Sequence, residues 1–341
     1  MRKYVKQGLL VAAFLVGLSG FSQNRQLDNF RSPDKNGINV FEAPKDTVST
    51  FDGIKVRVGG SSTLQFQALN HENSGALDLI PIGDNFNLAT ANLDLDVALA
   101  KGVRMHLRTY LSSRHHPEPY VKGGYFQVDN LDFISPGFLE EAMKYLTIKV
   151  GHMENNYGDT HFRRSDNSQA MYNPFVGNLI MDAFTTEVGG EVYFRKNGFI
   201  GMFGLSNGKL NQAVSNPETT GASILAKLGL EFFGTFETSS GKTDAETDNR
   251  TATQLAGELI YRFGNNENFY LATRYNTVTS DDPSGSEITI DRFQLGGGVF
   301  LTKNILAKIE YVNQQYDGYD TTSIFHEGEF KGVLLEAVIS F

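Results

Sequence analysis

From residue 54 to the last residue, apolar and polar side chains alternate along the chain with a period of two. In the first segment Ile54, Val58 and Phe66 share the even positions, with Arg57 and Gln65 between them. Successive side chains of a β-strand point to opposite faces, so the pattern predicts strands with one apolar and one polar face. Several segments run for roughly ten to fifteen residues, whereas a soluble strand usually has about five or six.

Two kinds of connection alternate between these segments. The short turns, such as 101–102 and 196–198, contain Gly and Asn, which tolerate positive φ. The long connections are polar and occupy residues 70–86, 114–119, 154–183, 207–221, 239–250, 280–288 and 317–328. Short turns at one end and long loops at the other are typical of outer-membrane barrels, whereas a soluble sandwich does not need this asymmetry.

The strand pattern predicts the fold class and its extent. The predicted strands are 54–69, 86–99, 103–113, 120–129, 145–153, 184–195, 199–206, 222–227, 230–238, 251–263, 269–279, 289–301, 305–316 and 329–341. This is an all-β transmembrane antiparallel β-barrel of fourteen strands over residues 54–341, with a helix predicted within 131–144. If 154–183 contains a further hairpin, the barrel has sixteen strands.

The final strand carries a specific signal. Val333, Leu335, Ala337 and Ile339 alternate with other residues, and the chain ends on an aromatic, Phe341. A barrel must pair its last strand with its first, because an unpaired edge is prohibitive in lipid. A terminal aromatic after such alternation resembles the assembly signal of bacterial outer-membrane proteins. The expected partners are therefore outer-membrane lipids and the barrel-assembly machinery, and a homo-oligomer is compatible with this architecture.

Residues 1–22 have the features of a secretory signal peptide. Arg2, Lys3 and Lys6 precede an apolar run of about ten residues, roughly half of what a membrane-spanning helix needs. Residues 23–53 are rich in Asn, Asp, Ser and Pro and predict an extended leader without a core of its own. Cleavage would remove three bases and no acid, changing the net charge from −9 to −12. These features predict export to the cell outer membrane.

Composition excludes several functional classes. The chain has no Cys, so it has neither disulfides nor thiolate metal sites. Its acidic balance argues against nucleic acid as a partner, since phosphate binding needs a basic face. The histidines and acidic turns do not form a convincing ligand set, so no metal or cofactor is predicted.

The polar parity of the strands predicts the wall of a pore. Because the apolar parity faces lipid, the polar one faces the barrel interior, and it is mixed in charge. The candidate wall residues are Asp94, Asp96, Arg104, His106, Arg108, Lys149, Glu187 and Glu191. A charged row such as Arg104–Arg108 sorts ions by sign, or it pairs with acids across strands and neutralises itself, and both can hold together.

The longest connection, 154–183, predicts a constriction. Its aromatic and charged residues are too abundant for a solvated loop, which suggests a loop folded into the pore. The candidate constriction residues are Tyr157, Asp159, His161, Arg163 and Arg164. The alternatives are a surface loop that packs on its neighbours, or arginines that tie the loop to acidic wall residues.

The segment around this loop resembles a known family. Tyr145-Leu146-Thr147-Ile148-Lys149-Val150-Gly151-His152, followed by Asn156-Tyr157-Gly158 and Arg163-Arg164, is similar to the strand and loop of phosphate-selective-type porins from bacteria of the Bacteroidetes group. The resemblance implies a porin. The family's phosphate selectivity rests on many lumen bases, whereas this chain has balanced walls.

The sequence therefore predicts a porin, not an enzyme, through which small hydrophilic solutes or ions diffuse passively. One alternative is an outer-membrane lipase or protease that uses His152 or His161; no Gly-x-Ser-x-Gly motif accompanies them, and the alternation places His152 on the lipid side. The other is a structural or adhesion barrel with a closed lumen.

Overall fold

The computed structural model describes residues 27–38, 40, 42–112, 116–154, 156, 162–181, 186–206, 223–230, 235–242, 251–282 and 284–341. The predicted signal peptide lies outside these residues. So do three of the predicted constriction residues, Tyr157, Asp159 and His161.

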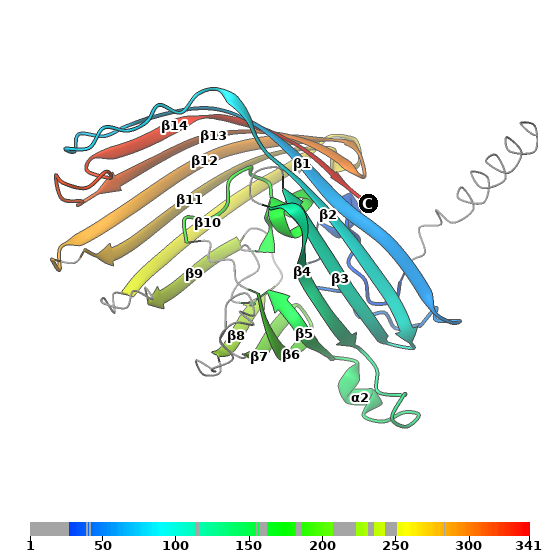
Figure 1. Cartoon of the computed structure of the whole chain (residues 1–341). Helices are drawn as coiled ribbons and strands as arrows, with labels where there is room; N and C mark the ends of the chain where they lie inside the picture. The colour runs from blue at the N-terminus through cyan, green and yellow to red at the C-terminus, as the bar shows by residue number, and fades with distance from the viewer. Residues whose placement is uncertain are drawn as a thin grey trace, which may run out of the picture.

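The described residues form one antiparallel sheet of fourteen strands (Figure 1). The strands are β1 (Lys55–Glu72), β2 (Asn85–Ala100), β3 (Val103–Ser112), β4 (His116–Val128), β5 (Leu146–Glu154), β6 (Thr186–Lys196), β7 (Phe199–Ser206), β8 (Ser223–Leu230), β9 (Thr235–Lys242), β10 (Thr251–Phe263), β11 (Phe269–Asp281), β12 (Glu287–Thr302), β13 (Ile305–Asp317) and β14 (Gly328–Ser340). Their order is β8-β7-β6-β5-β4-β3-β2-β1-β14-β13-β12-β11-β10-β9. The predicted segments match the observed strands to within four residues at each end, except that β9 begins five residues later than predicted.

The first and last strands meet in one seam. β1 pairs with β14 from Ser61 opposite Ser340 to Glu72 opposite Glu329. Beyond β14, the N–H and C=O of Phe341 bond to the C=O and N–H of Gly60, both at 3.0 Å. The edge groups that β1 and β14 would otherwise expose are therefore satisfied within the sheet, as a lipid environment requires.

The two ends of the barrel differ. At the short-turn end, Gly102 and Gly198 adopt positive φ in tight turns, and Asn197 does so beside Gly198. The helix predicted within 131–144 is a single turn, α2 (Glu140–Met143), at this end between β4 and β5 (Figure 1). The other end, the long-loop end, carries the connections 73–84 and 318–327.

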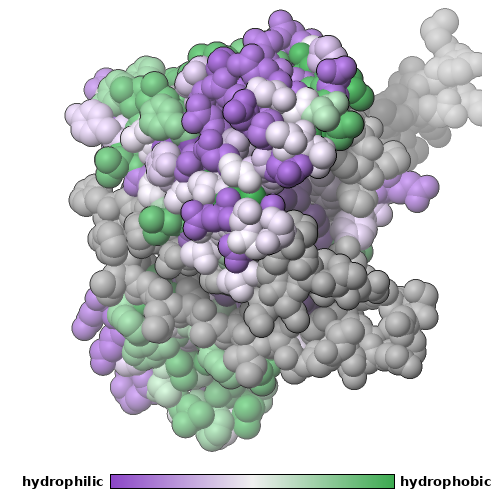
Figure 2. All heavy atoms as spheres, turned by 90° about the vertical axis from the view of Figure 1, so that its left-hand side faces the viewer, coloured by the Kyte–Doolittle hydropathy of each residue, from purple (hydrophilic) through white to green (hydrophobic). Residues whose placement is uncertain are grey.

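The two faces of the sheet differ in polarity. Outward-facing Leu259, Tyr261 and Leu335 are 69%, 70% and 43% exposed, whereas inward-facing Arg274 and Glu310 are 2% and 1% exposed. Seen from the long-loop end, hydrophilic residues gather in the upper middle and hydrophobic ones along the margins (Figure 2). An apolar outer face around a polar interior identifies a transmembrane β-barrel fold. No helix among the described residues has the length and apolar character needed to cross a membrane.

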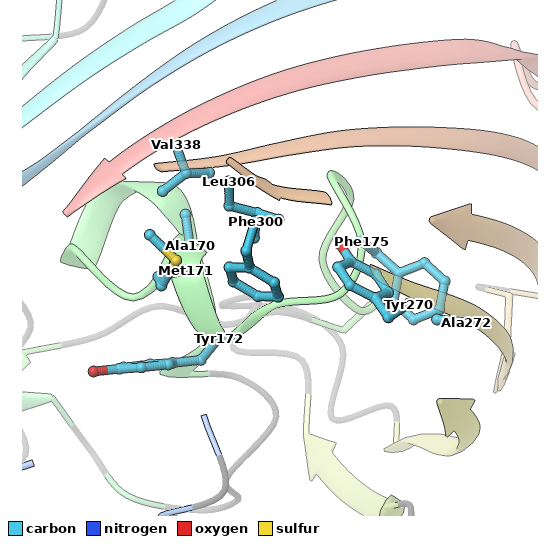
Figure 3. Close-up of a cluster of buried hydrophobic side chains, with 9 residues drawn as sticks. All are labelled: Ala170, Met171, Tyr172, Phe175, Tyr270, Ala272, Phe300, Leu306 and Val338. Atoms are coloured by element: carbon cyan, nitrogen blue, oxygen red, sulfur yellow. The ribbon is translucent and has the colours of Figure 1, made fainter. Parts of the chain in front are cut away.

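Part of the interior is apolar, which the alternation did not predict. Met171, Tyr172 and Phe175 of the long connection pack against residues of β11–β14, and the cluster also contains Ala170, Tyr270, Ala272, Phe300, Leu306 and Val338 (Figure 3). Phe175 and Val338 are fully buried. This side of the barrel therefore contains a packed core rather than water.

The N-terminal segment, residues 27–53, packs against the barrel at the short-turn end. Its Lys35 N–H donates to Lys303 C=O at 2.8 Å in the β12–β13 turn. Lys45 forms a 2.8 Å ion pair with Asp129, just after β4. The Tyr172 hydroxyl donates to Ser32 C=O, and a Cβ at Gly37 would lie 1.9 Å from that same oxygen. The described residues of the segment are held by groups of the barrel and of the long connection.

Candidate functional site

The described part of the long connection, residues 162–181, lies within the barrel and is called the inner loop here. It contains two 3-10 turns, Ser165–Asn167 and Ala170–Tyr172, and no strand. At its beginning, Asn92 Nδ2 donates to Asp166 C=O at 3.1 Å, and Arg108 donates to Asn167 C=O. The loop thus starts against the wall formed by β2 and β3.

The second half of the inner loop is bound to the opposite wall. The N–H groups of Val176 and Gly177 both donate to Glu310 Oε2, at 2.6 and 2.9 Å. The N–H of Ile180 donates to Asn276 Oδ1 at 2.7 Å. Side chains of β11 and β13 therefore replace the partners that these N–H groups would have in a strand or in water.

Two buried cations strengthen this attachment. Lys308 Nζ lies 2.6 Å from Glu336 Oε1 and also donates to Ala170 C=O at 2.7 Å. Arg274 pairs with Glu258 at 2.9 Å and donates to Gly177 C=O at 3.2 Å. Each of these cations is paired and hydrogen-bonded, as a charge in a dehydrated interior must be. The β10–β14 half of the lumen is consequently filled by the inner loop.

The space that remains lies along β1–β6. This lumen chamber has a volume of about 190 Å³ and is open to solvent. The barrel wall, the inner loop and the N-terminal segment all line it. Its charged lining residues are Arg31, Glu42, Arg57, Asp94, Asp96, Arg104, Arg108, Lys122, Lys149, Glu154 and Glu191.

The predicted charged row lines this chamber, and its members pair across strands. Asp96 lies 2.8 Å from His106 Nδ1, 3.1 Å from Arg57 Nη1 and 3.7 Å from Arg104 Nη1. The strand register places Asp96 directly opposite both Arg57 and His106. The row is therefore both a chamber wall and a set of cross-strand ion pairs.

The remaining wall candidates lie on the interior side of β5 and β6. Lys149 Nζ lies 4.3 Å from the centre of the Tyr193 ring, and the Tyr193 hydroxyl donates to Glu191 at 2.6 Å. Glu187 accepts a hydrogen bond from the Ser206 hydroxyl and is buried. Lys149 and Glu191 line the chamber, whereas Glu187 is not among its lining residues.

The two arginines of the inner loop contact acids. Arg163 Nη1 lies 2.8 Å from Glu258 of β10, and both side chains are buried. Arg164 Nε lies 2.7 Å from Asp166 within the loop. Arg163 thus ties the loop to an acidic wall residue, whereas the Arg164 pair lies within the loop.

Several chamber residues were not singled out from the sequence. Phe30 and Arg31 come from the N-terminal segment, which has no periodicity to mark them. His152, expected on the lipid side, also lines the chamber. It follows Gly151, whose φ of +146° is rare for other residues, and Glu154, which has the same parity as His152, lines the chamber as well. The glycine within the strand was the available signal of irregular backbone.

Comparisons with known proteins give a distant likeness. No family model matches the chain, and no curated protein matches it. Among solved structures it is similar to the outer-membrane protein OmpT of Vibrio cholerae, with 10% identity and a TM-score of 0.48 over 87% of this chain and 100% of that one.

Two further solved structures are channels. An anion-selective porin from Comamonas acidovorans has 11% identity and a TM-score of 0.44, over 84% of this chain and 100% of that one. The outer-membrane channel DcaP of Acinetobacter baumannii has 10% identity and a TM-score of 0.43, over 86% and 99%. The fold assignment itself rests on the strand pattern, the β1–β14 seam and the two unlike faces of the sheet.

Proposed function

We propose that this protein is a porin-type channel of a Gram-negative outer membrane, through which small hydrophilic solutes or ions diffuse passively. The observation that carries the proposal is the lumen chamber, a space of about 190 Å³ lined by eleven charged residues inside a barrel whose outer face is apolar. An apolar lining would instead favour a conduit for lipids. The passive mechanism needs no cofactor and no catalytic group.

The path would run between the inner loop and the β1–β6 wall. The hydrogen bonds to Glu310 and Asn276 hold the loop on the far wall and fix the width that remains. At the short-turn end Phe30, Arg31 and Glu42 line the chamber, so the N-terminal segment would narrow the exit. The pore would thus be narrow at two levels, one set by the inner loop and one by the N-terminal segment, which suits the passage of small solutes.

Selectivity for the sign of charge would be weak. Six of the lining residues are Lys or Arg and five are Asp or Glu. Opposite charges that face each other across strands create a transverse field rather than a net potential. The likeness of residues 145–164 to phosphate-selective-type porins therefore supports a porin, while the balanced lining does not favour phosphate in particular.

The proposal extends to the assembly and the cellular location of the protein. The proposed export by residues 1–22, recognition of the strand that ends in Phe341 by the barrel-assembly machinery, and contact of the outer face with lipid together describe an outer-membrane protein. Self-association would bring together outward faces like those of Leu259 and Leu335.

Planar-bilayer recording tests the proposal. Pure, folded protein should give discrete conductance steps, with a reversal potential in a salt gradient close to zero. The matched control is Leu259→Ala, which changes only the outer face and should leave both values unchanged. A folded preparation that gives no conductance steps would exclude a channel and favour a closed structural barrel.

A further inference from the structure

A second cavity lies at the long-loop end of the barrel, away from the lumen chamber. This outer pocket has a volume of about 210 Å³. It is formed by the ends of β1, β13 and β14 and by the connections 73–84 and 318–327. Its lining is mainly apolar and aromatic: Leu69, His71, Glu72, Leu79, Ile82, Tyr316, Ile324, Phe325, Gly328, Glu329 and Phe330.

The pocket opens toward the inside of the barrel mouth rather than toward lipid. Phe330 of β14 has the even parity of buried Glu336 and Val338. Its ring lies 5.8 Å from the guanidinium of Arg292, which donates to Asn178 C=O of the inner loop at 2.8 Å. A ligand in this pocket would therefore enter from the water at the barrel mouth.

Hydrogen bonds between the two connections hold the pocket in shape. The N–H of Ser74 donates to His326 C=O at 3.0 Å, and the N–H of Ala76 donates to Thr321 C=O at 2.9 Å. Asn73 Nδ2 donates to Ile324 C=O at 3.0 Å. The cavity is therefore preformed, which lowers the entropy cost of binding a small molecule.

Aromatic rings form one side of the pocket. Tyr316 and Phe325 are stacked, with centroids 4.9 Å apart, and Tyr319 lies 5.4 Å from Phe325. Phe325 remains 43% exposed, although it packs against these two tyrosine rings. Ring faces attract organic cations, whose weakly hydrated charge loses little on leaving water.

The surroundings of the pocket are strongly acidic. The stretches 72–84, 281–287 and 317–329 contain ten Asp and Glu, of which Glu72 and Glu329 pair with Lys331, just beyond these stretches, at 3.8 and 2.7 Å. Hydrogen bonds from Ser284 lower the pKa of Asp282, and those from Thr322 lower the pKa of Asp320, so both remain ionised at neutral pH. Such a rim raises the local concentration of cations and repels anions.

We propose that the outer pocket binds organic cations that have a compact apolar body, such as a small aromatic ring carrying a quaternary ammonium. The apolar lining accepts the body, Tyr316, Phe325 and Phe330 supply aromatic rings, and the acidic rim supplies the complementary charge. An anionic ligand is repelled by the rim, and a neutral one gains only the apolar contact.

Calorimetric titration of the full refolded chain in non-ionic detergent micelles tests this site. The probes are benzyltrimethylammonium, neutral benzyl alcohol and anionic benzoate. Benzyltrimethylammonium should bind saturably, benzyl alcohol about fivefold more weakly, and benzoate not at all. Phe325→Ala should weaken binding of the cation about three- to tenfold. Asp317→Asn with Asp320→Asn should weaken the cation but leave benzyl alcohol unchanged.

The matched control is Phe293→Ala, which removes an aromatic ring from the outward face of β12, where Phe293 is 42% exposed. It should leave the affinity for the cation unchanged, and heat-modifiable migration on gels verifies that each variant is folded. Equal affinity for cation and alcohol, unchanged affinity in Phe325→Ala, or no saturable binding to the wild type would each overturn the proposal. Because the measurement needs no conductance, its outcome is independent of channel activity.

Discussion

Arg108 donates two hydrogen bonds to Asp94 across the β2–β3 pair, from Nε to Oδ1 at 2.7 Å and from Nη2 to Oδ2 at 2.8 Å. The same guanidinium donates from Nη1 to Asn167 C=O of the inner loop. One side chain therefore joins the charged wall of the lumen chamber to the loop that fills the other half of the barrel. A fork of five donors can do this, whereas a lysine cannot.

Arg108→Ala should shift ion preference toward cations. The change leaves Asp94 without its charge partner beside the chamber, and one unpaired charge in a hydrated lumen is worth up to about 1 kcal/mol at 4 Å. We expect the cation-to-anion permeability ratio to rise about two- to fivefold, measured from reversal potentials in a salt gradient. Asp94→Asn should shift the ratio in the opposite direction. If both variants shifted it in the same direction, the lining would not set the preference.

Glu310→Ala should release the second half of the inner loop. Val176 and Gly177 lose their common acceptor, and a hydrogen bond to a charged group is worth about 1.5–3 kcal/mol. Urea unfolding in lipid vesicles should show a loss of that order, and single-channel traces should become noisier. Glu310→Gln retains one carbonyl acceptor and should lose less. Quiet, full-size steps in Glu310→Ala would show that other contacts suffice to hold the loop.

Lys308→Met should destabilise the barrel strongly. It leaves Glu336 buried without its 2.6 Å partner, and breaking a buried pair in this way typically costs about 3–5 kcal/mol. Lys308→Met combined with Glu336→Gln removes the unpaired charge and should recover part of that loss. The free energy of unfolding in urea provides the measurement. No recovery in the double variant would indicate that Lys308 acts mainly through Ala170 and Phe175.

Phe30→Ala should widen the exit at the short-turn end. The Phe30 ring lies 4.7 Å from the Arg57 guanidinium and 4.9 Å from that of Arg104, so it covers part of the charged wall. We expect a larger single-channel conductance, and a still larger one when residues 27–46 are deleted. Val48→Ala is the control, because Val48 is 74% exposed. Unchanged conductance in the deletion would place the narrowest point elsewhere.

The strands could be predicted from the sequence because lipid outside and polar groups inside impose opposite demands on successive residues. That alternation places Asp94, Asp96 and Arg108 on one face without any knowledge of distant contacts. Partners that depend on an irregular chain path could not be found in the same way. The ion pair between Arg163 and Glu258 needs the inner loop to reach β10, and no local period encodes that path.

The apolar cluster was missed for a related reason. Met171 and Phe175 lie in a connection, where a pattern of period two has no meaning, and Val338 has the inward parity that the alternation predicts to meet water. The interior position of each apolar residue is explained only by its contacts with the other members of the cluster. Likewise, no local pattern in residues 27–53 indicates that Phe30 lies beside Arg57. The contact forms only when the N-terminal segment folds back onto the barrel.

The one-sided placement of the inner loop also bears on how such a protein can change over evolution. On β10–β14 an inward residue is part of a packed, ion-paired core, so Lys308, Glu310 and Arg274 are constrained together. On β1–β6 an inward residue lines the chamber. Its replacement therefore changes the selectivity for permeants more than it changes the stability of the barrel. A lineage could thus acquire new permeants by substituting one wall while the opposite wall preserves the fold.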